Sequence, residues 1–119
     1  MNKVTLVIDK KKIEFHLGVG FLGELLDEQK CDITEMFNRI GTNIYKHLPI
    51  LMESSARYAL YRKGKQPKYK LVDFLDMIDN EGLNSPVLIE FMRHFNNSVN
   101  KDVPVEDDVV SEDAEPAGK

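Results

Sequence analysis

Two short runs near the start of the chain carry the hydrophobic patterns of β-strands. The run KVTLVI is rich in β-branched residues, which favour strands. The polar turn DKKK follows, and IEFHL then alternates strictly, with one apolar and one polar face. The apolar face holds Ile13, Phe15 and Leu17, and the polar face holds Glu14 and His16. We therefore predict a β-hairpin over residues 3–17, which needs further elements to pack against because an isolated hairpin is barely stable.

From residue 18 to residue 100 the hydrophobic positions change to helical spacing, and the pattern predicts about five helices. The first follows Gly20. Asp32 is typical of the N-cap of the second, with Glu35 three residues later as in a capping box. Gly41 is expected to end that helix. Pro49 suits the first turn of the third helix, because proline is well tolerated there.

The third helix carries an apolar stripe with small residues in its middle, which let a neighbouring helix approach closely. The stripe is Leu48, Leu51, Met52, Ser55, Ala56 and Ala59. Arg62, Lys63 and Gly64 favour its end, because bases complement the helix dipole and glycine allows the turn. A short fourth helix is expected between the loop KQPKY and NEG at 80–82; its apolar positions are Leu71, Phe74, Leu75 and Ile78.

The last helix has the clearest stripe in the chain. Ser85 and Pro86 suit its N-cap and first turn. Its apolar positions recur at i, i+3, i+4, i+7 and i+11: Leu88, Phe91, Met92, Phe95 and Val99. The whole pattern predicts an α+β fold that is predominantly α-helical, with an N-terminal β-hairpin followed by about five helices in one folded domain, residues 1–100.

The charge of the chain is concentrated after residue 100. The formal net charge is −4, from 16 basic and 20 acidic residues. Residues 101–119 hold seven of the acids and two of the bases, which leaves 13 acids and 14 bases in residues 1–100. Scattered valines among acids and two prolines cannot bury a core, so we predict a disordered acidic tail over 101–119.

The segment LGVGFLGELL contains a literal G-x-G-x-x-G at Gly18, Gly20 and Gly23. A dinucleotide-binding turn needs a buried parallel strand before it, a second strand after its helix, and an acid about 20 residues on. Here half of a hairpin precedes the motif, and Asp32 to Ile40 read as another helix. We therefore interpret Gly18 and Gly20 as the turn from strand to helix, with Gly23 giving close packing, and predict no bound cofactor.

Other chemical constellations also favour structural interpretations. Asp73, Asp76 and Asp79 share a helix face, but they lack the spacing of a calcium loop. The three histidines, His16, His47 and His94, lie far apart without a second ligand at i+3 or i+4, and Cys31 has no nearby histidine. We predict no catalytic residue and no metal site, and hence no enzyme.

The segment from Arg57 to Lys70 has six bases, no acids and three tyrosines. Interleaved bases and aromatics can bind single-stranded nucleic acid by charge and stacking. A small nucleic-acid-binding regulator using residues 57–70 is therefore the alternative function, although nucleic acid is the less favoured partner and a protein with an acidic surface the more favoured one. The lone cysteine and the absence of any long apolar run predict a soluble cytoplasmic protein with no membrane segment.

The order of several patches resembles a known family. The chain runs from a hairpin with a Lys-rich turn through FHLGVGFLGELL, NIYKHLPILMESSARYALYRKGK and LVDFLDMIDNEG to LIEFMRHFNNSV. Over roughly residues 3–99 it is similar to the tail assembly chaperones of long-tailed (siphovirus-type) bacteriophages. The resemblance implies a non-enzymatic, mostly helical protein of the bacterial host cytoplasm that is missing from the mature virion. Such chaperones bind and solubilise the tape measure protein and recruit tail tube subunits.

Two groups of residues are the candidates for partner binding. One lies at the end of the third helix, and the other is the stripe of the last helix, where a core role is the competing interpretation for each residue. They are Tyr58, Tyr61, Arg62 and Lys63, and Leu88, Phe91, Met92 and Phe95. A domain this small is not expected to bury every stripe, so one face stays open for a partner or for a homo-oligomer.

Overall fold

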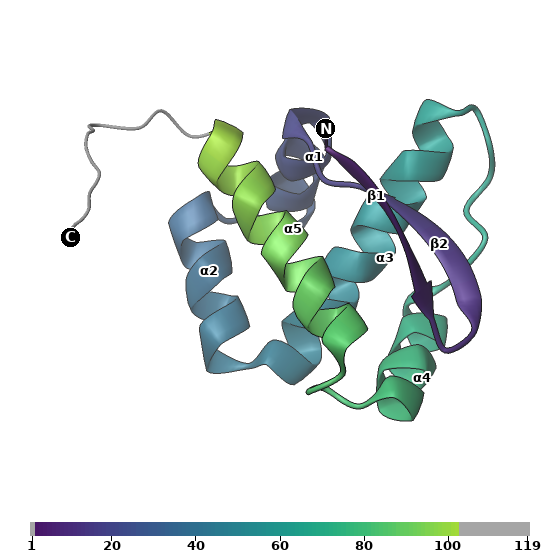
Figure 1. Ribbon diagram of the computed structural model, residues 1–119. Coiled ribbons are helices and arrows are strands. Elements are labelled where there is room, and N and C mark those ends of the chain that lie inside the picture. Colours follow the sequence, from purple (N-terminus) through teal and green to yellow (C-terminus); the bar gives the residue numbers. More distant parts are fainter. Residues whose placement is uncertain (1, 103–119) are drawn as a thin grey trace.

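A two-stranded hairpin and five helices make up the described part of the chain in the computed structural model (Figure 1). The backbone is described for residues 2–102 and the side chains for residues 2–99. The strands are β1 (Lys3–Ile8) and β2 (Lys11–His16), and the helices are α1 (Val19–Gln29), α2 (Ile33–Thr42), α3 (Ile44–Arg62), α4 (Leu71–Glu81) and α5 (Pro86–Asp102). The predicted α+β, mainly helical fold is confirmed.

The predicted acidic tail, residues 101–119, is described only at its start. Its first two residues continue α5, which therefore runs two residues beyond the predicted end of the folded domain. Residues 103–119 lie outside the described part of the chain.

The hairpin is antiparallel, with Val4 opposite Phe15 and Leu6 opposite Ile13. Its two-residue turn, Asp9 and Lys10, adopts positive φ angles of 50° and 65°, which match the twist of the flanking strands. The turn is also attached to the end of α4, because the amide of Asp9 donates to Glu81 Oε2 at 2.7 Å. The inward face of the hairpin, with Ile8, Ile13 and Phe15 buried, covers the core.

Helix α3 is the centre of the domain and contacts β2, α1, α2 and α4. Every residue of the predicted stripe of α3 is buried, including the small residues Ser55, Ala56 and Ala59. The predicted start at Pro49 is wrong, since α3 begins at Ile44 and carries Pro49 inside it. A proline inside a helix removes one backbone hydrogen bond. The buried face of α3 outweighs that loss, because tertiary packing supplies most of a helix's stability.

Local end signals were accurate for three other helices. Asp32 accepts a hydrogen bond from the amide of Glu35 at 2.8 Å, as predicted for the N-cap of α2. Gly82 ends α4, and Ser85 Oγ accepts from the amide of Val87 at the start of α5. Gly41, in contrast, does not end α2, which continues to Thr42 before a corner at Asn43. Asn43 caps both α2 and α3, so the corner has no room for a separate loop.

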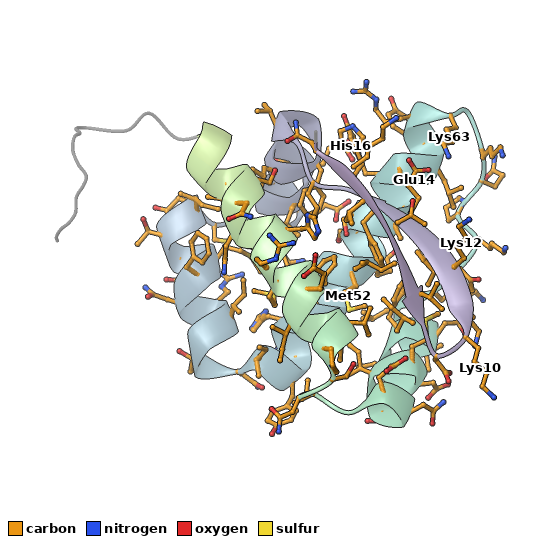
Figure 2. All side chains as sticks on the ribbon, in the orientation of Figure 1. Lys10, Lys12, Glu14, His16, Met52 and Lys63 are labelled. Atoms are coloured by element: carbon orange, nitrogen blue, oxygen red, sulfur yellow. The ribbon has the colours of Figure 1, made fainter. Side chains whose placement is uncertain are left out.

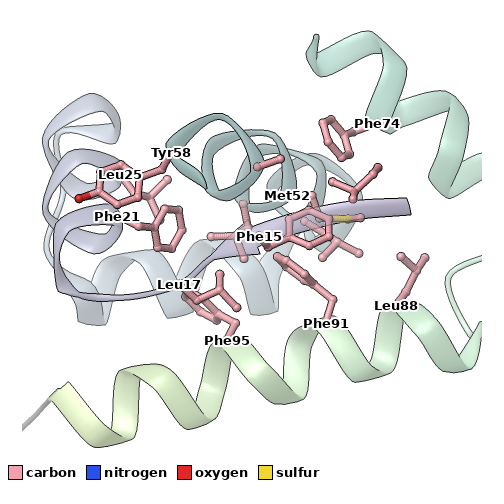
Figure 3. Packing of buried hydrophobic residues seen from close by; sticks show 14 of the residues in the cluster. Phe15, Leu17, Phe21, Leu25, Met52, Tyr58, Phe74, Leu88, Phe91 and Phe95 are labelled. Atoms are coloured by element: carbon pink, nitrogen blue, oxygen red, sulfur yellow. The ribbon is translucent and has the colours of Figure 1, made fainter. Parts of the chain in front are cut away.

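Aromatic side chains from three elements meet in the core (Figure 3). Phe15 of β2 packs edge-on against Phe91 of α5, with ring centroids 5.0 Å apart, and lies 6.3 Å from the ring of Phe74 in α4. Farther along α5, Ser98 Oγ donates to the carbonyl of Leu17. Helix α5 is thus joined to the hairpin by aromatic packing and by a hydrogen bond.

Candidate functional site

The glycine motif positions a tyrosine of α3. Gly18 is the N-cap of α1, as the strand-to-helix interpretation requires, but Gly20 lies inside α1, which begins at Val19 and not after Gly20 as predicted. A Cβ atom at Gly20 would lie 2.0 Å from Tyr58 Oη, so glycine is needed for this contact. Gly23 has no atom within 4 Å of such a Cβ, and its predicted close packing is wrong. The motif follows one strand of an antiparallel pair and precedes α2, which is not the setting of a dinucleotide-binding turn.

The titratable groups singled out from the sequence lie in separate places. Among residues 2–99 no group of three or more His, Cys, Asp or Glu side chains is arranged to hold a metal ion. Asp73 accepts from the amide of Lys70 at 2.7 Å and so caps α4. His94 pairs with Glu90 on α5 at 2.9 Å. His47 is buried, and its Nδ1 has no hydrogen-bond partner in this part of the chain.

The stripe of α5 divides between core and surface. Leu88, Phe91 and Phe95 are at most 1% exposed, so these candidate partner-binding residues are core residues in this structure. The ring of Phe91 packs against Phe15 of the hairpin, and the ring of Phe95 lies 5.7 Å from that of Phe37 on α2. Met92 is only partly buried and packs at the edge of the core. Of the four candidates on α5, Met92 alone has a partly exposed side chain, although buried Leu88 also lines the hollow described next.

Met92 lines an open hollow of about 380 Å³ between α5 and the start of α3. We call this hollow the apolar groove; its lining residues are Ile44, Leu48, Leu83, Leu88, Ile89, Met92, Arg93 and Asn96. Ile89 is 59% exposed, a high value for an isoleucine beside a hollow lined mainly by apolar side chains. Arg93 and Asn96 form a polar rim.

Sequence reasoning missed most of the apolar groove. The available signal was Ile89, which lies outside the buried stripe of α5 but three residues before Met92, on the same side of the helix. Ile44 and Leu83 gave no signal, because the folding of the chain alone brings the corner after α2 and the loop before α5 together.

The candidates at the end of α3 also divide. Tyr58 is buried, with its ring 5.3 Å from that of His16, whereas Tyr61 is 67% exposed. Arg62 and Lys63 are exposed. The ammonium of Lys63 pairs with the carboxylate of Glu14 on β2, and this contact holds the pKa of Glu14 below its usual value.

These residues border a second groove, of about 180 Å³, where the loop after α3 passes beside β2. We call it the β2-edge groove; it is lined by Lys12, Ile13, Glu14, Ala56, Arg57, Ala59, Leu60, Lys63, Lys68 and Tyr69. Figure 2 shows Lys12 and Glu14 following each other along β2, with Lys63 beside Glu14. Ile13, Ala56, Ala59 and Leu60 make an apolar interior between bases.

Arg57 fixes one wall of the β2-edge groove. Its guanidinium donates to both carboxylate oxygens of Glu28, at 3.0 and 3.1 Å, and to Glu53 at 2.9 Å. Hydrogen bonds to Glu28 and then to Glu53 raise the pKa of Arg57 above its ordinary value. Arg57 is therefore paired within the protein, as Lys63 is with Glu14. Lys12 and Lys68 line the groove without an ion pair among the described residues.

No protein-family model, curated protein or solved structure matches this chain. Within residues 2–102, no helix combines the length and the apolar content that crossing a membrane requires. The candidate site therefore rests on the two grooves themselves.

Proposed function

We propose that this chain is a tail assembly chaperone of a long-tailed bacteriophage and that its apolar groove binds the tape measure protein. The observation that carries the proposal is the groove itself, where Ile89 and Met92 stay accessible although the rest of the α5 stripe is buried. The order of sequence patches that resembles this family supports the same role.

The chemistry of the apolar groove suits an apolar helix face. An amphipathic helix binds a partner by laying residues at i, i+3, i+4 and i+7 into a hydrophobic groove. Fully covering a side chain such as Ile89 contributes about 1.5–3 kcal/mol. The thioether of Met92 adapts its shape to different neighbours, which suits a chaperone that meets several segments of one long client. Arg93 and Asn96 supply the polar rim that is usual around a protein interface.

The wider role follows from the same proposal. The chaperone acts in the cytoplasm of the bacterial host, keeps the tape measure protein soluble, recruits tail tube subunits and is absent from the finished virion. It carries out no reaction of its own. A homo-oligomer is the competing use of the apolar groove, with a second copy covering Ile89 in place of the client.

Coexpression with a fragment of the tape measure protein tests the proposal. The fragment should stay soluble with the wild-type chain and with Val19→Asp, but precipitate with Ile89→Asp. Val19 is a matched control because it is 65% exposed on α1 and does not line the apolar groove. A fragment that is equally insoluble with and without the wild-type chain would refute the chaperone role. Equal loss in both variants would refute the assignment to this groove.

The alternative, a nucleic-acid-binding regulator, draws on the exposed bases Arg62, Lys63 and Lys65 and on exposed Tyr61. Burial of Tyr58 weakens it, because a buried ring offers no face for a base to stack on. Salt-dependent gel shifts that disappear when Arg62, Lys63 and Lys65 become Ala would favour this function, and no shift at low salt would remove it.

A further inference from the structure

The outer edge of β2 presents backbone groups that the hairpin does not use. The amide of Leu17 donates to the carbonyl of Asn2 at 2.7 Å, so these opposed residues are a hydrogen-bonded pair. Hydrogen-bonded and non-hydrogen-bonded pairs alternate along an antiparallel ladder. In the observed register, Lys12 and Glu14 therefore belong to non-hydrogen-bonded pairs, and their N–H and C=O groups point away from β1.

Nothing in the described part of the chain uses this edge. Among residues 2–102, no backbone hydrogen bond joins Lys12 or Glu14 to a segment outside the hairpin. The β2-edge groove lies along the same residues, with an apolar interior and bases on its walls. An open strand edge beside such a groove is the setting for β-strand addition, in which an extended peptide bonds to the edge and places alternate side chains in the groove.

The charges select an acidic peptide. Lys12, Lys63 and Lys68 line the groove, whereas Glu14 is its single acidic lining residue among those described. A carboxylate from a bound peptide would replace Glu14 as the partner of Lys63. Nucleic acid fits this site less well, because an open strand edge requires N–H and C=O groups from its partner.

The chain contains a segment of this chemistry. Residues 105–113, VEDDVVSED, hold five acids, three valines and no base. Residues 103–113 reach at most about 36–40 Å from Asp102 when extended, at about 3.3–3.6 Å per residue. Ser98, four residues before the end of α5, donates to the carbonyl of Leu17, three residues after Glu14, so the acids at the end of the segment are within reach of the β2-edge groove.

We propose that residues 105–113 bind the β2-edge groove, with their backbone on Lys12 and Glu14 and their carboxylates on the lysines. Covalent attachment favours this segment over a separate acidic peptide, because a segment tethered to its own domain has an effective concentration of roughly millimolar. The composition that prevents the segment from forming a core does not prevent such binding, since the groove supplies the apolar surface and the opposite charge. The proposal is independent of the chaperone role.

Amide hydrogen exchange in the full-length protein tests the binding. The variant replaces Glu106, Asp107, Asp108, Glu112 and Asp113 by the matching amides and leaves the described domain unchanged. In the wild type the outward amides of Lys12 and Glu14 should exchange about two- to tenfold more slowly than in the variant, the ratio that one net hydrogen bond of about 0.5–1.5 kcal/mol gives. High salt should reduce the wild-type protection.

The outward amides of Thr5 and Val7, on the free edge of β1, are the internal control and should not change. Lys12→Glu with Lys68→Glu should remove protection as the tail variant does. Equal exchange at Lys12 and Glu14 in wild type and tail variant would overturn the proposal, as would an equal change at Thr5 and Val7. Protection that rises with protein concentration would assign the edge to a second copy. Oligonucleotide binding at this edge that ignores the tail substitutions would assign it to nucleic acid.

Discussion

The two ends of α3 border two grooves that differ in how their side chains are held. At the first end, Ile44, Leu48, Ile89 and Met92 line the groove with apolar side chains, and Arg93 on the rim pairs with Glu90 of its own helix. At the second end, Arg57 and Lys63 are paired with acids of α1, α3 and β2. One helix thus carries an adaptable apolar surface and a fixed charged one.

The two ends of α3 can be separated experimentally by changing the ionic strength. Binding in the apolar groove depends on area removed from water, which changes little with moderate salt. Binding in the β2-edge groove depends partly on exposed charges, which salt screens. A client that uses only the apolar groove should therefore keep its affinity at an ionic strength that releases an acidic peptide from β2.

Removing a core ring that supports both grooves should affect the two ends of α3 together. Phe91 packs against Phe15. It therefore connects α5, which borders the apolar groove, to β2, which borders the β2-edge groove. Phe91→Ala should lower the free energy of unfolding by about 3–5 kcal/mol, through lost burial and a cavity. Binding in the apolar groove and binding in the β2-edge groove should then be lost together. Urea unfolding measures this loss, and Ile89→Ala on the exposed side of α5 should change stability by no more than about 0.5 kcal/mol. A small loss for Phe91→Ala would show that the ends are independent.

A second substitution acts on one end. Gly20→Ala places a methyl group where Tyr58 Oη lies, so Tyr58 must move and the end of α3 must repack. We expect a loss of about 1–3 kcal/mol, the usual cost of overpacking. Gly23→Ala is the matched control three residues on; nothing lies near its added Cβ, and it should stabilise α1 by about 0.5–1 kcal/mol. Thermal unfolding of both variants measures the two effects. Equal shifts of the melting temperature in the same direction would contradict the close contact between Gly20 and Tyr58.

A third, smaller effect acts on the other end and depends on pH. Burial, then the charges of Lys46 and Arg39, lower the pKa of His47. The unfolded state therefore takes up a proton more readily than the folded state does. The stability from neutral His47 is complete above the unfolded pKa of about 6.5 and is lost as the pH falls from there through the lowered folded pKa. The difference between the urea midpoints at pH 7.5 and pH 5.5 should be smaller in His47→Gln than in the wild type. Burial also lowers the pKa of His16, which lies near the other end of α3. The pH dependence that remains in His47→Gln therefore includes the contribution of His16.

The smallest effect concerns the ion pair across the β2-edge groove. Lys63→Ala and Glu14→Gln should each change stability by less than about 1 kcal/mol, because exposed pairs contribute little. Their effects on an acidic peptide should differ in sign. Glu14→Gln frees a lysine and should strengthen binding, whereas Lys63→Ala should weaken it. Titration with a peptide of residues 103–115 measures both, and parallel changes would show that the pair does not compete with the peptide.

Local chemistry made much of the fold predictable. Asp32, Gly82 and Ser85 act through neighbours within four residues, so their positions could be read directly from the sequence. Pro49 was misread because its usual place in a first turn is a local preference, while the buried face of α3 is a property of the whole domain. The prediction that Gly41 ends α2 was also wrong, because α2 continues to Thr42 and Asn43 forms the corner before α3.

The sites were less predictable because they depend on contacts between distant segments. Leu88, Phe91 and Phe95 had the spacing of a binding face, and that spacing is identical for a core face. Neither groove has a local sequence signature. Lys63 and Glu14, which form an ion pair, are 49 residues apart, and Leu83 and Ile44, which line one groove, also come from distant segments. The pattern predicted that part of a stripe stays open; Met92 is partly buried, and the exposed side chain beside it, Ile89, lies outside the stripe.

The attachments of the hairpin affect how the protein is made. The hairpin leaves the ribosome before the helices, yet several groups that secure it come late in the chain: Glu81 at its turn, and Phe91 and Ser98 on the last helix. At about 5–20 residues per second, those partners follow the hairpin by several seconds. During that interval α3 can already contact β2, but the part of the apolar face that Phe91 covers stays open, so we expect the nascent chain to need protection until α5 is complete.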